Sequence, residues 1–217
     1  MLRPHRKLRE ARPTLLEPAS VRLTLGLAAF AALVALGQGV RRRRLRGLDR
    51  KVRRDVRPKG DRRLTNAARV VCTVAEPRVH PLIASAIAAA AWPRIGSRAL
   101  RIPAAALVST ALDRAARYVV QQHRPPGASK HPGRDRYAFP SGHTTAATAI
   151  ALATALELTG PEAPVLRRTL PAMAVLVAAT VGGARLYLDE HWADDVIGGW
   201  LAGTGIACTL TALMPDA

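Results

Sequence analysis

Long apolar stretches, separated by short polar or proline-containing turns, follow one another along most of the chain. Four stretches are nearly uninterrupted and approach the about 20 apolar residues that cross a bilayer. They cover residues 23–40, 145–159 with its flanks, 170–188 and 196–214. Two more, at 79–92 and 100–120, are interrupted by proline or charged residues. The sequence shows no strand-like alternation, so the pattern predicts an all-α integral membrane bundle of five or six transmembrane helices.

The C-terminal stretches are predicted to form a four-helix core. We expect its helices at residues 100–122, 142–159, 169–188 and 194–213. The loop at 123–140 is polar and rich in proline and glycine. Before the core, Pro77 and Pro81 divide the run at 64–92 into a short approach helix and a spanning helix.

Charge divides the chain into a basic N-terminal part and a nearly balanced remainder. The 217 residues carry a formal net charge of +18, although 49% of them are hydrophobic. Residues 1–70 hold 20 Lys/Arg against 5 Asp/Glu, whereas residues 71–217 hold 13 against 10. We therefore expect a basic tail at 1–20, a first transmembrane helix at 21–40, an Arg-rich segment at 41–63 and a helical membrane domain at 64–214.

The Arg-rich segment contains 13 Lys/Arg, and Leu45, Leu48, Val52 and Val56 recur among them at helical spacing. Such a pattern favours a helix lying on the membrane surface against anionic lipid. An arm that binds nucleic acid is a competing interpretation, and plain disorder is another. The segment has no aromatic residue to stack on bases, so we expect no nucleic-acid partner.

Polar residues recur at one end of the predicted four-helix core. Consecutive helices alternate in direction, so the polar ends of all four helices lie on the same side of the membrane. Ionisable residues at membrane depth are costly and usually functional. The residues expected together at this rim are Arg117, Arg124, Ser141, His143, Arg185, His191 and Asp195.

Spacing within this set indicates how the side chains cooperate. His191 and Asp195 are four residues apart, so the carboxylate can hold one ring nitrogen and leave the other free. Arg117 and Arg124 are seven apart and share a face if their helix extends that far. Asp113, four residues before Arg117, can orient its guanidinium.

The types of residue at this rim suit a phosphate group. Ser141 and Gly142 begin a helix and offer backbone N–H groups to an anion. The planar fork of arginine matches phosphate oxygens bidentately. One histidine can then attack phosphorus while the other protonates the leaving oxygen. A phosphate would also explain His143, because a titratable ring at the mouth of an apolar helix is costly without a partner.

Each feature also has a plainer interpretation. Arg117 and Arg124 can mark the membrane interface, and His191 with Asp195 can be a satisfied structural pair. The segment at 187–195 can alternatively bind a divalent cation through its four carboxylates, those of Asp189, Glu190, Asp194 and Asp195.

Three motifs resemble the signature motifs of the type-2 phosphatidic acid phosphatase superfamily in order and spacing. They are R-x6-R-P at 117–125, P-S-G-H at 140–143 and A-R-x5-H-x3-D at 184–195, and the resemblance covers residues 64–214. The chain departs from the family twice, with Arg117 in place of the usual lysine and Ala184 in place of the usual serine. Arg117 keeps the charge with a different geometry, and Ala184 lacks a hydroxyl donor.

The resemblance implies a metal-independent phosphohydrolase without a cofactor that acts on a phosphorylated lipid through a phosphohistidine. Candidate substrates are polyprenyl phosphates or diphosphates, phosphatidic acid and phosphatidylglycerophosphate. It implies that His191 is the nucleophile, that Asp195 orients it and that His143 is the general acid. The phosphoryl oxygens would be bound by Arg117, Arg124, Arg185 and the backbone of Ser141 and Gly142.

Two other functions stay open at this point. A vanadium-dependent haloperoxidase uses the same oxyanion pocket, although those relatives are large and soluble. A catalytically inactive membrane protein would use the Arg-rich segment to anchor lipids or partners. The sequence specifies neither the lipid nor the oligomeric state.

Membrane topology is the point on which two lines of reasoning conflict. The resemblance implies a multi-pass protein of the cell membrane with its active site on the outer face, which puts residues 41–63 outside. The positive-inside rule instead puts a segment with 13 Lys/Arg in the cytoplasm. We adopt the outer-face assignment as the prediction.

Overall fold

The computed structural model describes residues 19–56, 60–76, 78–129, 136–159 and 164–214. The predicted basic tail lies almost wholly outside these residues. Their helices are α1 (Ala19–Arg41), α2 (Arg46–Val56), α3 (Arg62–Val74), α4 (His80–Ile95), the 3₁₀ helix η1 (Gly96–Leu100), α5 (Arg101–Val120), α6 (Gly142–Leu158), α7 (Pro164–Tyr187) and α8 (Ala193–Leu213). The described residues form no strand beyond an isolated bridge between His123 and Tyr137. The predicted all-α fold is confirmed.

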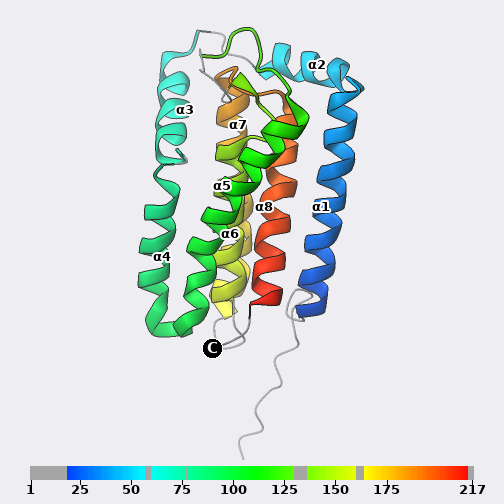
Figure 1. The fold of residues 1–217 in the computed structure, drawn as a ribbon. Helices are drawn as coiled ribbons and strands as arrows, with labels where there is room; N and C mark the ends of the chain where they lie inside the picture. The colour runs from blue at the N-terminus through cyan, green and yellow to red at the C-terminus, as the bar shows by residue number, and fades with distance from the viewer. Residues whose placement is uncertain (1–18, 57–59, 77, 130–135, 160–163, 215–217) are drawn as a thin grey trace, which may run out of the picture.

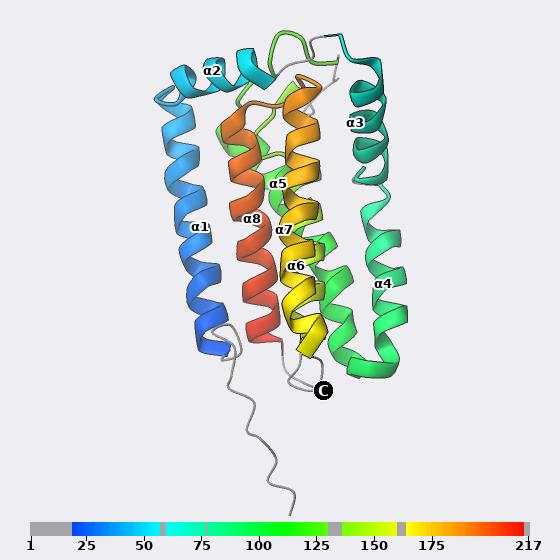
Figure 2. The same ribbon diagram turned by 180° about the vertical axis from the view of Figure 1, so that it is seen from behind.

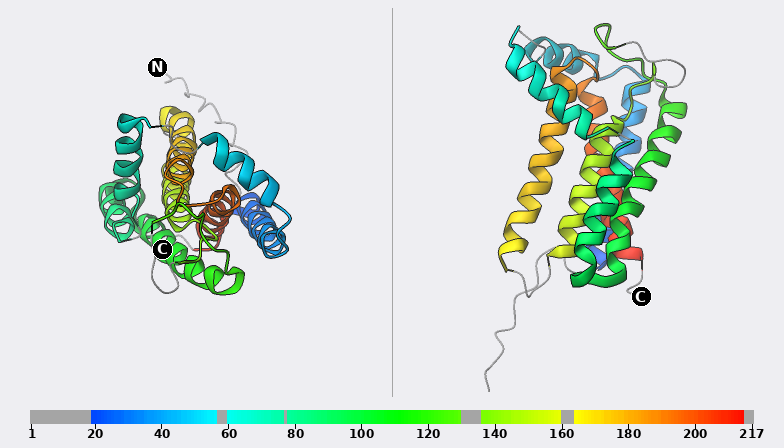
Figure 3. Two further views of the ribbon diagram at one scale, coloured as in Figure 1. Left: turned by 90° about the horizontal axis from the view of Figure 1, so that it is seen from above. Right: turned by 90° about the vertical axis from the view of Figure 1, so that its left-hand side faces the viewer.

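The long helices stand side by side along one axis (Figure 1). Helix α8 packs between α1 and α6, and α6 also packs against α5 and α7. Helices α3 and α4 stack end to end as a further column at the edge of the bundle, as the view from behind also shows (Figure 2). Helix α2 lies across one end of the bundle. Seen from above, it is next to the end of α1 (Figure 3).

The outer surface of the bundle is apolar, as contact with lipid requires. By length and composition, three helices within the described residues are able to cross a membrane, and they cover Ala19–Arg41, Val165–Tyr187 and Ala193–Leu213. Large apolar side chains face outward on several helices, including Leu27, Val34, Leu107 and Val175. In water such surfaces would promote aggregation, whereas lipid accommodates them.

Small residues bring α8 close to α6 and so align the ends that carry the two histidines of the predicted site. A Cβ atom at Gly199 would lie 2.7 Å from the Cβ of Thr144, and one at Gly203 would lie 2.5 Å from the Cβ of Thr148. Neither glycine can therefore be replaced without separating the helices. Close approach of backbones at small residues is the usual way in which membrane helices associate.

Helix α5 ends two residues earlier than predicted, and this changes one argument. Gln121 adopts a left-handed conformation, with φ of 53°, and terminates the helix after Val120. The chain then runs extended, with the Ala138 N–H donating to the Gln122 carbonyl at 2.7 Å. Arg124 lies on this extended segment, so the helix does not extend far enough for Arg117 and Arg124 to share a helix face. A loop, not a helix, carries Arg124.

Helix α2 lies at the end of the bundle where α5 and α7 terminate and α6 and α8 begin (Figure 1). Of the apolar residues noted in this part of the sequence, Leu48 is exposed, whereas Leu45, Val52 and Val56 are half-buried. Asp49 is buried against the bundle. Polar as well as apolar contacts therefore attach this helix to the rest of the protein.

Candidate active site

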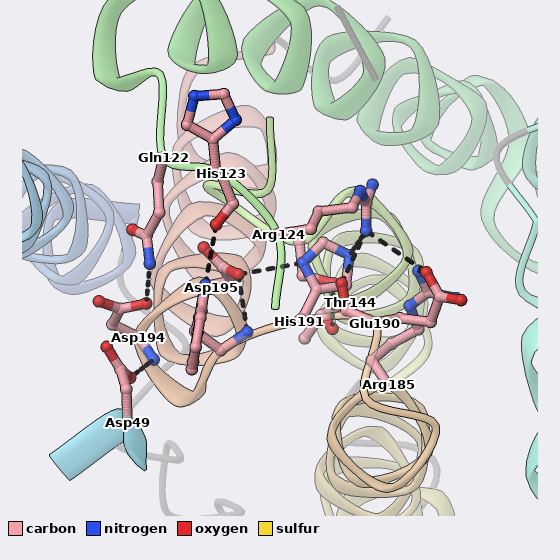
Figure 4. Close-up of polar contacts among 12 residues, drawn as sticks. Asp49, Gln122, His123, Arg124, Thr144, Arg185, Glu190, His191, Asp194 and Asp195 are labelled. Carbon is pink, nitrogen blue, oxygen red and sulfur yellow. Dashed lines mark hydrogen bonds and ion pairs between the residues drawn. The ribbon is translucent and has the colours of Figure 1, made fainter. Parts of the chain in front are cut away.

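His191 and Asp195 form a buried pair at the start of α8 (Figure 4). Asp195 Oδ2 accepts the backbone N–H of Trp192 at 2.8 Å and lies 3.3 Å from His191 Nδ1. Both side chains are fully shielded from solvent. The two residues do not share a helix face, because His191 precedes the helix. Instead Asp195 caps the first turn of α8 and holds the ring with the same oxygen.

Arg124 contacts the other ring nitrogen of His191. Its NH1 lies 3.0 Å from His191 Nε2 and also donates to the Glu190 carbonyl at 2.8 Å. A guanidinium only donates hydrogen bonds, so Nε2 accepts and the ring proton sits on Nδ1, facing Asp195. This tautomer directs the Nε2 lone pair toward the arginines, which is the arrangement a nucleophilic histidine needs.

Glu190 lies between two of the predicted phosphate ligands. Its Oε2 is 3.8 Å from Arg124 NH1 and 3.7 Å from Arg185 NH2, and its Oε1 accepts the Ser129 N–H at 3.2 Å. The carboxylate therefore brings the two guanidinium groups together without a close hydrogen bond to either of these atoms. Within the described residues, the buried Arg185 Nε has no hydrogen-bond partner. It is available to an oxygen of a ligand.

Arg117 reaches the same end of the bundle from the last turn of α5. Its Nε donates to Asp113 Oδ1 at 3.0 Å, as the four-residue spacing predicted. Asp113 in turn packs against the start of α6, because a Cβ atom at Gly142 would lie only 3.0 Å from Asp113 Oδ2. The missing side chain at Gly142 thus allows the Asp113–Arg117 pair to approach the N-terminus of α6.

Ser141 makes contacts that differ from the prediction. It occupies the N-cap position of α6, but its side chain caps no backbone group and instead accepts a hydrogen bond from Thr144 Oγ1 at 3.0 Å. Its backbone N–H donates to the Asp195 carbonyl at 2.9 Å. The Ser141 N–H is thus engaged with α8 in this structure, and its role in binding a phosphate stays a prediction. Ser141 joins the two helix N-termini.

His143 lies in the first turn of α6, next to an unexpected neighbour. Its ring is 6.5 Å from that of His80 in an edge-to-face arrangement. His80 is 3% exposed, and neither of its ring nitrogens has a hydrogen-bond partner among the described residues. A single histidine at the start of α4 has no spacing signal in the sequence, so His80 was not predicted.

The electrostatics of the pocket favour a neutral nucleophile among fixed positive charges. Burial, and next the charges of Arg185 and Arg124, hold the pKa of His191 well below the ordinary value of 6.5. Burial lowers the pKa of Arg124 to about 10, with the neighbouring Arg185 and Arg117 contributing. Arg124 still carries its charge at neutral pH. The pocket therefore attracts an anion while His191 keeps its lone pair.

The carboxylates that could have formed a cation site point to separate partners. Asp189 pairs with Arg53, Glu190 lies between Arg124 and Arg185, and Asp195 holds His191. Asp194 Oδ1 accepts from Gln122 Nε2 at 2.9 Å. Among the residues that the structure describes, no group of three or more His, Cys, Asp or Glu side chains is arranged to hold a metal ion.

Helix α2 contacts the loop that carries His191, which the sequence did not predict. Arg53 donates to both carboxylate oxygens of Asp189, at 2.7 and 2.8 Å, and its guanidinium lies 5.7 Å from the centre of the Trp192 ring. Asp49 accepts the backbone N–H of Asp194 at 3.2 Å. These contacts fix both sides of His191. Such contacts join segments that are far apart in the sequence, so no local sequence pattern reveals them.

Ala184, the second departure from the family motif, packs against α3. It is buried in a cluster with Ala68 and Cys72 of α3, against which Tyr187 also packs. A small apolar side chain here serves the contact between α3 and α7.

Comparisons with known proteins agree with this geometry. The family model of the PAP2 superfamily matches residues 82–217. An undecaprenyl-diphosphatase of Sulfolobus acidocaldarius is 30% identical over 106 residues, which are 46% of this chain and 48% of the relative. The matched region is thus about half the length of that curated relative. A transmembrane PAP2-type phosphatidylglycerolphosphate phosphatase from Bacillus subtilis superposes with a TM-score of 0.75 at 18% identity, covering 85% of this chain and 93% of that structure. The similarity to that structure establishes the membrane fold.

Proposed function

The chain belongs to the PAP2 superfamily, and from this premise we propose that it is a metal-independent phosphohydrolase. It would remove phosphate from a lipid phosphate or diphosphate through a phosphohistidine intermediate. The observation that carries the proposal is the His191–Asp195 pair, with the histidine in its Nδ1–H tautomer and its Nε2 beside Arg124. A structural ion pair does not require the second ring nitrogen of the histidine to face a cluster of arginines.

In the first step His191 Nε2 attacks phosphorus, and the bond between phosphorus and the lipid oxygen breaks. The electron pair stays on that oxygen, which takes a proton from His143 at the start of α6. Asp195 stabilises the positive charge that develops on the His191 ring, because its Oδ2 already faces Nδ1 at 3.3 Å. In the second step water attacks the phosphohistidine, His143 accepts its proton, and inorganic phosphate leaves.

The arginines would bind the non-bridging oxygens of the transferring phosphoryl group. Arg117, Arg124 and Arg185 converge from α5, the following loop and α7, so they surround the site from three elements. Their fixed positive charges complement the negative charge of a trigonal-bipyramidal phosphoryl group. Electrostatic stabilisation of this kind is usually the largest contribution that a pocket makes to phosphoryl transfer. At Gly142 the helix N-terminus adds a backbone donor. A divalent cation in this pocket would meet repulsion.

The substrate is proposed to be a lipid, because the site lies at one end of a bundle whose outer surface is apolar. A polyprenyl diphosphate, phosphatidic acid or phosphatidylglycerophosphate would keep its chains beside the helices while its phosphate reaches the arginines. One relative is named for a polyprenyl diphosphate and another for a phosphatidylglycerol phosphate. We further propose that this end of the protein faces outward from the cell membrane.

The decisive experiment measures phosphate release by the purified protein from a panel of lipid monophosphates and diphosphates, with and without a chelator. We expect turnover on at least one lipid, unchanged by the chelator, inhibited by vanadate and absent in His191→Ala. Trapping of acid-labile phosphate on the protein should also disappear in that variant. If no lipid phosphate is hydrolysed, the enzymatic proposal fails. Loss of activity on chelation with recovery in magnesium would reject the metal-independent mechanism.

A further inference from the structure

A cleft of about 540 Å³ opens between α1, α2 and the segment that follows α5. It adjoins the catalytic pocket, because Arg124 belongs to both, and Trp192 and Asp194 form part of its wall. The arginines that line it are Arg41, Arg43, Arg46, Arg50, Arg53 and Arg124. Nothing in the proposed reaction uses the first four of these.

The charge in this cleft is only partly neutralised by the protein. Among the described residues, Arg41, Arg43, Arg46 and Arg50 have no acidic partner, whereas Arg53 pairs with Asp189. Like charges this close repel one another, so an anion between them would lower the energy of the folded state. The turn after α1 also holds Arg43 in a left-handed conformation, with φ of 58°, which non-glycine residues seldom adopt.

The two acidic residues of the cleft do not oppose an anion strongly. Asp49 and Asp194 are 4% and 2% exposed, and each is engaged with protein, Asp49 with the Asp194 N–H and Asp194 with Gln122. Burial also raises the pKa of the Asp49 carboxyl. The open part of the cleft is therefore cationic.

Apolar residues complete the lining on the side of the bundle. Val40 at the end of α1, Leu45 before α2 and Val120 at the end of α5 all contribute. Inorganic phosphate gains no stabilisation from contact with apolar side chains. A phospholipid, by contrast, carries a charged phosphodiester joined to apolar chains. The combination of arginines with an apolar wall next to membrane-spanning helices thus fits a lipid better than a free anion.

We propose that this cleft is a second lipid site, next to the catalytic pocket and sharing only Arg124 with the predicted phosphate ligands, that binds the headgroup of an anionic phospholipid. The phosphodiester would lie among the arginines of α2 and the α1–α2 turn, with its chains along α1 and α5. The site is independent of the proposed hydrolysis, because its ligand is bound and not cleaved. Its occupant would hold α2 against the end of the bundle.

Native mass spectrometry of the full chain in detergent tests this site. Phosphatidylglycerol, an anionic diester, is offered in one arm, zwitterionic phosphatidylcholine in a second, and phosphatidylglycerol with excess inorganic phosphate in a third. We expect retained phosphatidylglycerol adducts that excess phosphate does not displace, and few phosphatidylcholine adducts. In the double variant Arg46→Gln/Arg50→Gln the affinity for phosphatidylglycerol should fall at least about fivefold, which corresponds to a loss of about 1 kcal/mol of binding free energy.

Matched variants distinguish lipid in this cleft from lipid held diffusely or in the catalytic pocket. Arg42→Gln/Arg54→Gln removes the same charge from neighbouring positions that do not line the cleft and should retain the lipid. Arg185→Gln, in the catalytic pocket, should retain it too. Equal loss in both double variants would mean diffuse attraction and overturn the proposal. Loss of the lipid in Arg185→Gln would mean that it occupies the catalytic pocket. Displacement by inorganic phosphate would mean that the cleft is a site for free anions. Either result would also overturn the proposal. Equal melting temperatures establish that each variant is folded.

Discussion

At the scale of single residues, the two histidines of the pocket differ in what holds them. His191 has the Asp195 carboxylate 3.3 Å from Nδ1, whereas the ring of His143 lies edge-to-face with that of His80 at 6.5 Å. A carboxylate fixes the tautomer of a nucleophile and stabilises its cation. His143 stands at the positive end of α6, which favours release of a proton to the leaving oxygen.

This difference predicts opposite responses to the quality of the leaving group. His191→Ala should abolish turnover and the covalent intermediate on every substrate. His143→Ala should lose about 10²–10⁴-fold on a lipid alkyl phosphate, the usual contribution of a general acid, but much less on an aryl phosphate, whose oxygen leaves without a proton. Steady-state rates of both variants on the two substrates check this. Rescue of His191→Ala by the aryl phosphate would reverse the assignment.

The depressed pKa of His191 predicts the acid side of the pH profile. A nucleophile acts when deprotonated, and burial with Arg185 and Arg124 lowers its pKa below 6.5. The value of kcat/KM should therefore stay high as the pH falls through 6.5 and decline only at lower pH. Arg185→Gln removes one of the positive neighbours of His191, so the pKa of His191 should rise and kcat/KM should begin to decline at a higher pH. A wild-type decline centred above pH 6.5 would contradict the electrostatic argument.

Residue chemistry was the part of the site that sequence predicted best. The four-residue spacing of His191 and Asp195, and of Asp113 and Arg117, predicted contacts that the structure contains. The use of the Ser141 N–H by Asp195 was not predictable, because it depends on how closely α6 and α8 approach each other. Spacing describes one element at a time, and such a bond joins two.

At the scale of elements, α2 holds the loop that carries the nucleophile. Arg53 grips Asp189 through two hydrogen bonds, and Asp189 stands two residues before His191 with φ of 58°. An aspartate in this left-handed conformation depends on its surroundings to stay there. The interfacial helix therefore positions the catalytic loop without touching the substrate.

Breaking this grip should slow turnover more than it weakens binding. Arg53→Gln is expected to lower kcat roughly tenfold, about 1.4 kcal/mol of barrier, with KM little changed. Asp189→Asn should act likewise, and the double variant should be no worse than either single one. The matched control is Arg54→Gln, whose side chain is 78% exposed and faces Asp55. Additive losses, or equal activities of Arg53→Gln and Arg54→Gln, would contradict the positioning role.

The elements themselves follow closely from the apolar pattern, and the differences have local causes. The predicted core helices at 142–159 and 194–213 agree with α6 and α8 to within a residue at each end. Helix α5 instead ends at Val120, because Gln121 turns left-handed. The apolar run stops at Val120, but Gln121 and Gln122 are residues that a helix accepts, so the pattern alone extended the predicted helix to residue 122. For α2, spacing predicted a helix but not that Asp49 would be its buried side.

At the scale of the whole molecule, the Arg-rich segment and the active site lie at the same end of the bundle (Figure 1). The opposite end also carries arginines, namely Arg94, Arg98, Arg101, Arg167 and Arg168, of which Arg98 and Arg101 pair with Glu157. The positive-inside rule counts charge near the ends of the spanning helices and favours the more basic end for the cytoplasm. The more basic end of this bundle is the one that carries the active site, so the rule places the site in the cytoplasm and conflicts with the proposed outward orientation.

An anionic lipid in the α2 cleft would reduce this conflict, because it neutralises arginines whose positive charge otherwise opposes an outward orientation of this end. Orientation is then decided by labelling intact cells with an impermeant maleimide. Gly60→Cys lies at the end with the site and Arg94→Cys at the other, while the native Cys72 and Cys208 are buried. For an outward active site we expect Gly60→Cys to react in intact cells and Arg94→Cys to react only after permeabilisation. The reverse pattern would place the arginines and the site in the cytoplasm, and the substrate would then have to come from the inner leaflet.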